Sequence, residues 1–220
     1  MKKIMAVLSL CSVFAMALAF AGCSGEQTFE AKNWESGDTV VKSVAIDVED
    51  RAVEVIPSED GQVHIEYSES EKEYYNISVS EDGELTMTFE TNKTWTDYIG
   101  TKPAAEYRKI VVALPEGLFG ITVSTTNETV DVSSLAVKGE ISLNSNGGNL
   151  NFEKLEVGTE LSVTAKNGNI TGSVRGGWDD FAIDCKVKSG KSNLPEIKEG
   201  GTKSLVANCN NGDVNIDFVA

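Results

Sequence analysis

The chain has 220 residues, of which 34 are acidic and 19 are basic, so its formal net charge is −15. Hydrophobic residues make up 40% of the chain and charged residues 24%, a balance that is typical of a folded protein and argues against global disorder. The absence of any Lys and Arg cluster argues against nucleic-acid binding, which requires such clusters to neutralise phosphates. His64 is the single histidine, which excludes most hydrolase triads and most histidine-ligated metal sites.

The first 23 residues predict export followed by lipid anchoring. Lys2 and Lys3 form a basic start, residues 4–20 carry no charge, and Ala21-Gly22 precede Cys23. The Ala-Gly-Cys sequence resembles the lipobox of bacterial lipoproteins, in which the cysteine receives a diacylglyceryl thioether and the chain is cut just before it. An ordinary cleaved signal with an incidental cysteine, or an uncleaved anchor helix, are the alternatives.

Lipidation at Cys23 predicts an extracytoplasmic protein that is anchored to the bacterial cell membrane rather than spanning it. Residues 1–22 would be the signal peptide, and residues 23–39 the lipidated cysteine with a flexible tether rich in Ser, Gly and charge. Removing residues 1–22 takes away two lysines and no acids, so the mature chain has 34 acids against 17 bases and a net charge of −17. Anionic head groups should repel such a domain.

Residues 40–118 predict a run of short strands. Apolar residues alternate with polar ones, as in Val44, Ile46 and Val48, and later in Ile110, Val112 and Leu114. Two near-identical segments, residues 58–61 and 80–83, end in Asp-Gly and predict hairpin turns. They lack the spacing of acidic oxygens that a calcium loop needs, so we predict no metal site there.

Residues 119–220 contain an internal repeat that predicts a β-solenoid. Five units begin at steps of 20, 20, 20 and 24 residues, which suits one coil of short strands per repeat. Stacked parallel coils should bury two columns of side chains, the first being Ile121, Ile141, Leu161, Phe181 and Leu205, and the second Val123, Leu143, Val163, Ile183 and Ala207. Asn-Gly, Gly-Asn and Gly-Asp corners should turn the chain, because Gly and Asn adopt left-handed conformations at little cost.

The same alignment places Cys185 and Cys209 in one column on adjacent coils. A disulfide is one possibility, because export permits oxidation and the α-carbons would lie within range. Two free buried thiols are the other, because in-register parallel strands strain the dihedral angle of a disulfide. A catalytic thiol is disfavoured, since the only histidine lies in the other half of the chain with no partner motif.

A lipoprotein signal, the lead-in that ends in residues 110–115 (Ile-Val-Val-Ala-Leu-Pro), and the repeats Asn167-Gly-Asn-Ile170 and Asn211-Gly-Asp-Val214 together resemble the bacterial "putative adhesin" family. The resemblance covers residues 40–220. It implies an all-β domain at the cell surface, in which a strand lead-in (residues 40–118) runs into a right-handed, single-stranded β-solenoid (residues 119–220). The family offers no catalytic residues, so none are carried over.

Aromatic residues outside the repeats mark a candidate recognition surface. Trp95 and Tyr98, with Tyr107 nearby, lie in a polar stretch that predicts a long loop before the strand at Ile110. Such side chains can stack on sugars or peptide side chains, or they can fold back to cover the open end of the solenoid. We interpret the acidic residues of the lead-in, such as Asp50 and Glu73, as a solvated face.

These observations predict a lipid-anchored, non-enzymatic β-solenoid that acts as a binding or adhesion module for a protein or glycan. An envelope-stress or scaffold lipoprotein that contacts a membrane partner of the same cell is the alternative. A polysaccharide-active β-helix enzyme is disfavoured, because the outward repeat positions are mostly Ser, Thr and Asn with no recurring acidic pair. We predict no cofactor.

Overall fold

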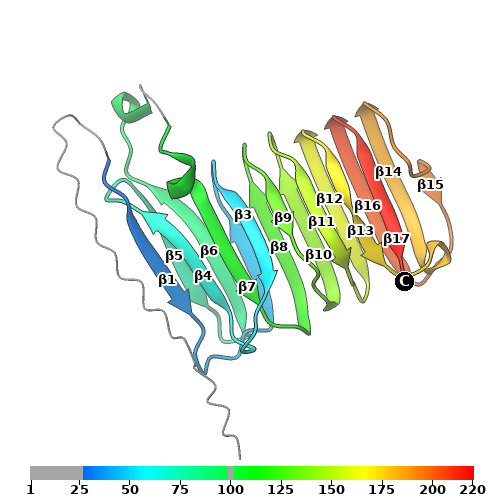
Figure 1. Cartoon of the computed structure of the whole chain (residues 1–220), viewed down its shortest axis with the longest axis horizontal. Coiled ribbons are helices and arrows are strands. Elements are labelled where there is room, and N and C mark those ends of the chain that lie inside the picture. Colours follow the sequence, from blue (N-terminus) through cyan, green and yellow to red (C-terminus); the bar gives the residue numbers. More distant parts are fainter. Residues whose placement is uncertain (1–26, 99–101) are drawn as a thin grey trace, which may run out of the picture.

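The computed structural model describes residues 27–98 and 102–220. Two large β-sheets face each other and run along the length of the molecule (Figure 1). Alternating apolar residues produce both sheets, because each strand buries one face against the opposite sheet and leaves the other face in solvent. The expectation of an all-β, solenoid-like domain is therefore confirmed.

The eight-strand sheet has the spatial order β1 (Glu30–Glu35), β4 (His64–Glu69), β7 (Lys109–Leu114), β3 (Ala52–Pro57), β9 (Val130–Val132), β11 (Leu150–Leu155), β13 (Ile170–Arg175) and β17 (Val214–Val219). The nine-strand sheet has the order β15 (Ile197–Lys198), β14 (Phe181–Ser189), β16 (Lys203–Asn211), β12 (Glu160–Asn167), β10 (Val137–Ser145), β8 (Leu118–Thr125), β2 (Ser43–Asp47), β6 (Glu84–Thr91) and β5 (Glu73–Val79). Three short 3-10 helices are described: η1 (Trp95–Tyr98), η2 (Ala105–Arg108) and η3 (Trp178–Asp180).

Each central coil contributes one strand to each sheet, as in the successive pairs β8–β9, β10–β11 and β12–β13. Neighbouring coils are parallel and in register. Ile141 lies opposite both Ile121 and Leu161, and Leu143 lies opposite both Val123 and Val163. The first three members of both predicted columns are therefore confirmed.

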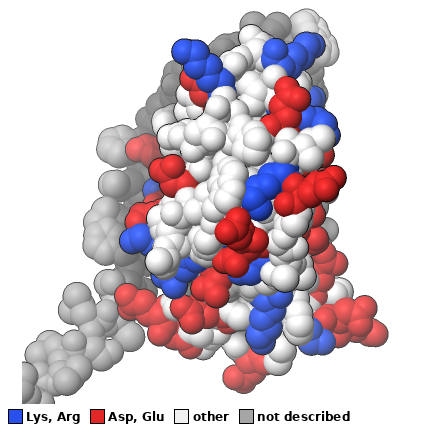
Figure 2. All heavy atoms as spheres, turned by 90° about the vertical axis from the view of Figure 1, so that its right-hand side faces the viewer, with Lys and Arg blue, Asp and Glu red and all other residues white. Residues whose placement is uncertain are grey.

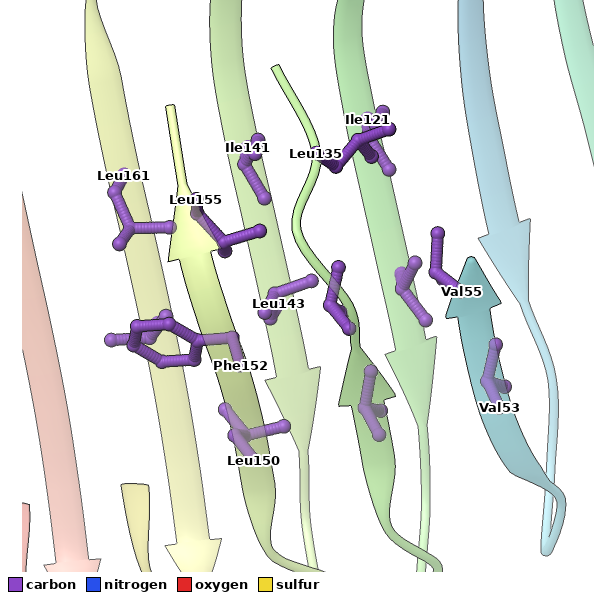
Figure 3. Packing of buried hydrophobic residues seen from close by; sticks show 14 of the residues in the cluster. Val53, Val55, Ile121, Leu135, Ile141, Leu143, Leu150, Phe152, Leu155 and Leu161 are labelled. Carbon is purple, nitrogen blue, oxygen red and sulfur yellow. The ribbon is translucent and has the colours of Figure 1, made fainter. Parts of the chain in front are cut away.

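The core fills the space between the sheets. Figure 3 shows side chains of β3 and β11 pointing toward those of β8, β10 and β12. Ile141, Leu143 and Leu150 are each 1% exposed or less. Burying such a side chain contributes about 1.5–3 kcal/mol, so the stacked columns supply the main favourable term for folding.

The spatial order of the coils departs from the chain order at both ends of the stack. The pair β2–β3 lies between β6–β7 and β8–β9, and β16 lies between β12 and β14. Leu205 therefore lies opposite Leu161 on one side and opposite Ile183, not Phe181, on the other. The expected place of Phe181 between Leu161 and Leu205 is wrong. The strand β16 lies between β12 and β14, and the register of β14 against β16 is shifted by two residues from the expected one.

Only one of the two predicted hairpin turns is a hairpin. Residues 80–83 join the antiparallel neighbours β5 and β6, and Gly83 has φ +85°. Residues 58–61 also turn the chain, with Gly61 at φ +78°. However, β7 lies between β3 and β4, so this second turn connects strands that are not paired.

The corner glycines stack directly on one another, for a reason that differs from the expected one. A Cβ on Gly168 would lie 2.2 Å from the carbonyl oxygen of Gly148, and a Cβ on Gly212 would lie 2.2 Å from that of Gly168. Gly148 and Gly168 are not in the left-handed region, nor are the corner asparagines. Close approach of neighbouring coils, rather than backbone conformation, therefore excludes side chains at Gly148 and Gly168.

Residues 30–35, which the sequence analysis includes in the tether, form β1 and pair antiparallel with β4. Trp34 on this strand packs against the core. Across residues 27–98 and 102–220, no helix combines the length and the apolar character that crossing a bilayer requires.

Candidate functional site

The connection from β6 to β7 carries the predicted aromatic residues. It contains η1 and η2, which lie beyond the strand ends on the side of the stack near β1 (Figure 1). Trp95 is 77% exposed and Tyr98 is 66% exposed. These two side chains lie in solvent rather than covering the end of the core, so of the two interpretations of this loop the structure favours the exposed one.

Ion pairs hold η1 against the body of the domain. Asp97 pairs with Lys72 and accepts a hydrogen bond of 2.8 Å from the backbone N–H of Thr94. The bond from Lys72, and then that from Thr94, lower the pKa of Asp97 to about 2. Lys93 pairs with Glu73, and its Nζ lies 5.5 Å from the centre of the Tyr98 ring. The exposed aromatic residues are thus presented from a base that is fixed to the sheet.

The third predicted aromatic residue, Tyr107, has a different environment. It lies on η2, is 37% exposed, and stacks on Phe29 with ring centroids 5.1 Å apart and an interplanar angle of 10°. Tyr107 therefore connects the loop to the residues that precede β1.

A pocket of about 170 Å³ lies beneath the loop. We call it the corner pocket and define it by its lining residues: Glu49, Asp50, Arg51, Glu73, Phe89, Thr91, Lys93, Asp97, Tyr98, Lys102, Pro103 and Arg108. Its wall includes charged groups from the β2–β3 corner, from β5 and from the connection between β6 and β7. We call this connection, residues 92–108, the aromatic loop.

Arg51 is the centre of the pocket wall and is 1% exposed. Its Nη2 lies 3.1 Å from Oε2 of Glu73, and its Nε donates a hydrogen bond of 2.6 Å to the hydroxyl of Tyr75. Its guanidinium carbon lies 4.8 Å from the centre of the Phe89 ring. Burial raises the pKa of Tyr75, which keeps its hydroxyl neutral. A buried charge needs such partners, because an unpaired one costs several kcal/mol.

Glu73 is 4% exposed and therefore does not belong to a solvated face, contrary to the sequence interpretation. The sequence did contain a signal. Glu73 has the same phase as Tyr75, Ile77 and Val79 along β5, which is the inward phase of that strand. A carboxylate at an inward position indicates a buried partner. Arg51 directly precedes β3 and likewise has the same phase as the buried Val53 and Val55.

Asp50 fixes the neighbouring corner in an unusual conformation. Its φ is 52°, and its Oδ1 accepts a hydrogen bond of 2.6 Å from Asn127. The Nζ of Lys102 lies 3.3 Å from its Oδ2. Burial raises the pKa of Asp50, but the hydrogen bonds from Asn127 and Lys102 outweigh this effect and lower it.

The charges around the pocket are largely matched with one another. Lys93 pairs with Glu73, Lys102 with Asp50, and Arg108 with Glu128 outside the lining. To a binding partner, the loop therefore presents exposed aromatic side chains. The charges around them are paired with one another, so they do not add up to a strong positive or negative potential. In the described parts of the chain, no group of three or more His, Cys, Asp or Glu side chains is placed to hold a metal ion.

On parallel neighbouring strands, two acidic pairs face outward that the sequence did not lead us to expect. Glu140 lies opposite Glu160 on neighbouring coils, and Glu54 lies opposite Asp131. Glycosidases place their two carboxylates on either side of a bond held in a groove. Neither pair lines the corner pocket or the second hollow, of about 290 Å³, above the ends of β2, β8 and β10.

Cys185 and Cys209 are both free and buried in the structure. They are not opposite each other, since Cys185 faces Ala207 and Cys209 faces Val187. The two-residue offset of β14 again explains the difference from the predicted column. Burial raises the pKa of the Cys209 thiol, which disfavours the reactive thiolate. Cys23 and the predicted signal peptide lie outside the described residues.

Comparisons with known proteins agree with this architecture. A family model described as Toastrack DUF4097 matches residues 41–219. A "putative cell adhesion protein" from Clostridium sporogenes has a similar structure, with a TM-score of 0.62 at 12% identity, over 88% of this chain and all of that one (100%). "Putative adhesins" from Bacteroides fragilis (TM-score 0.34, 11% identity, 88% of this chain and 98% of that one) and Parabacteroides distasonis (0.30, 15%, 89% and 98%) also match. No curated protein matches.

Proposed function

Since the chain belongs to the Toastrack DUF4097 family, we propose that it is a lipid-anchored, non-catalytic binding module of the bacterial cell surface. In this proposal Cys23 carries the lipid, the residues between Cys23 and β1 form the tether, and the stacked coils form a rigid body. The single-stranded, right-handed path that the family resemblance implies is part of the same proposal. The name of the Clostridium protein supports an adhesion-like role by analogy of fold.

One observation carries the proposal: Trp95 and Tyr98 are exposed on a loop that ion pairs fix to the domain. Large aromatic side chains supply much of the energy of protein recognition, because they bury a large area and lose little conformational entropy. A fixed base reduces the ordering cost further. We therefore propose Trp95, Tyr98 and Tyr107 as the recognition surface.

The test is a binding assay with the chain from residue 23 onward, carrying Cys23→Ala so that it stays in solution. The probes are host matrix proteins, bacterial cell-wall glycans and lipid vesicles. We expect saturable binding to one class of probe, and its loss in the Trp95→Ala and Tyr98→Ala variants. Trp178→Ala is the matched control, because Trp178 is 43% exposed but lies on η3, far from the loop in the stack.

Binding that survives the loop variants would refute the proposed surface. A blank result with every probe would favour the scaffold alternative, in which the partner is a membrane protein of the same cell. Lipidation is tested separately, by comparing detergent-phase partitioning of the wild-type protein with that of Cys23→Ala. Unchanged partitioning would refute the anchor.

A further inference from the structure

We infer that the aromatic loop faces the membrane that holds the anchor, and that Trp95 and Tyr98 contact its head-group interface. This inference rests on the proposed function and names the partner of its recognition surface. It concerns the orientation of the whole domain: the end that carries η1 and η2 lies next to the bilayer, and the end formed by β14 and β15 points away.

The first argument is the length of chain between the anchor and the domain. Three residues separate Cys23 from Gln27, the first described residue, so the two α-carbons are four residue steps apart. A fully extended chain spans at most about 3.6 Å per residue, so the α-carbon of Gln27 lies within about 14 Å of that of Cys23. A tether this short cannot lift the domain clear of the membrane. Whichever part of the domain surrounds Gln27 must lie close to the head groups.

The second argument is that the chain reaches the domain beside the aromatic loop. The Nε2 of Gln27 donates a hydrogen bond of 2.6 Å to Ser70, in the turn between β4 and β5. Lys72 in the same turn pairs with Asp97 of η1. Phe29, two residues after Gln27, stacks on Tyr107 of η2. In Figure 1 the blue start of β1 and the two green helical turns lie at the same end of the molecule.

The third argument is the chemistry of the loop. Trp and Tyr are the side chains most enriched at membrane–water interfaces, where an apolar ring and a polar tip are both satisfied. The described loop residues, 92–98 and 102–108, contain three bases (Lys93, Lys102, Arg108) and two acids (Asp97, Glu106), so their net charge is +1. The mature chain as a whole carries −17. Anionic head groups, which repel the domain as a whole, thus meet a slightly positive charge on this loop.

The opposite end of the stack exposes its tryptophan less than the aromatic loop does. Figure 2 looks onto that end and shows acidic and basic side chains interspersed around an uncharged strip. Trp178 there is less exposed than Trp95 and packs edge-on against Phe218, with ring centroids 5.3 Å apart. It lies on η3 between β13 and β14, at the end of the stack away from β1. The two tryptophans therefore report on opposite ends of the domain.

Fluorescence quenching of single-tryptophan variants tests the orientation. The lipidated protein is reconstituted in vesicles of phosphatidylcholine and phosphatidylglycerol that contain brominated phosphatidylcholine as the quencher. One variant retains Trp95 (Trp34→Phe, Trp178→Phe), and the matched control retains Trp178 (Trp34→Phe, Trp95→Phe). We expect the Trp95 emission to shift to the blue and to be quenched, with neither change for Trp178. Thermal melting of both variants confirms that they are folded.

Flotation with the vesicles distinguishes failure of the inference from failure of the proposed function. A protein that floats, but in which Trp95 is not quenched, would overturn the orientation and leave the anchor intact. Equal quenching of the two tryptophans, or quenching of Trp178 alone, would also overturn it. A wild-type protein that does not float would refute the anchor itself, and the orientation with it.

Discussion

Gly168→Ala should destabilise the domain although it adds only one methyl group. The new Cβ would lie 2.2 Å from the carbonyl oxygen of Gly148 and 2.7 Å from its carbonyl carbon. Both are backbone atoms of the next coil, and the interstrand hydrogen bonds hold that coil at a spacing of about 4.8 Å. Neither atom can rotate away as a side chain would, so the coils must separate locally.

Overpacking of this kind costs about 1–3 kcal/mol. For a domain of this size, 1 kcal/mol corresponds to a shift of roughly 2–4 °C in Tm, so we expect Tm to fall by about 2–12 °C. Gly120→Ala is the matched control in β8, because its Cβ would lie 3.5 Å from the carbonyl oxygen of Glu140, an ordinary contact. Gly-to-Ala changes at compatible positions stabilise by about 0.4–1 kcal/mol.

Urea denaturation followed by far-ultraviolet circular dichroism gives the free energy of unfolding for both variants, and thermal melting gives Tm. The signs should be opposite: Gly168→Ala less stable than the wild-type protein, and Gly120→Ala equal or slightly more stable. If Gly168→Ala is as stable as the wild-type protein, then the corner glycines are not in steric contact, and the stacking argument is wrong.

Three further predictions concern the buried and paired groups. Glu73→Ala should lower the free energy of unfolding by about 3–5 kcal/mol in urea denaturation, because the arginine that it neutralises stays buried. Asp97 has a pKa of about 2 in the folded protein against a usual 3.8. Its stabilisation of the loop is therefore complete above the usual pKa and is lost as the pH falls toward 2. Release of the loop at low pH should change the fluorescence emission of a variant that has Trp95 as its only tryptophan. Cys185 and Cys209 should react with a thiol reagent only after denaturation, as measured by absorbance.

Each of these predictions has a control or a result that contradicts it. Glu66→Ala removes an exposed acid from β4 and should change stability by less than about 0.5 kcal/mol. Constant circular dichroism during the acid titration is needed to show that the loop, not the whole domain, responds. Fast labelling of the folded protein would show that the thiols are accessible, and no labelling after denaturation without reductant would reveal a disulfide.

From residue 40 onward, the sequence by itself determined most strands, the face that each of them buries and the central stack, whereas β1 was missed. Period-two alternation specifies which side chains point inward, and a 20-residue repeat places them in register, as Ile121, Ile141 and Leu161 show. These are local properties of the chain. The loop before β7 could be predicted on the same basis, because no alternation continues through it. The exposure of Trp95 and Tyr98 on that loop could not, since the sequence equally allowed them to fold back over the core.

Only the tertiary structure decided which coils are neighbours at the two ends of the stack. Each coil offers the same kind of apolar ladder to either side, so the sequence pattern cannot specify that the β16 coil inserts between β12 and β14. That insertion moved Phe181 and separated Cys185 from Cys209. The corner pocket depends on the same long-range order, because Arg51 and Glu73 are brought together by the packing of β2–β3 beside β6 and β5. Local alternation fixes the face that a strand buries, whereas the partner of a buried charge is fixed by contacts between segments distant in the chain.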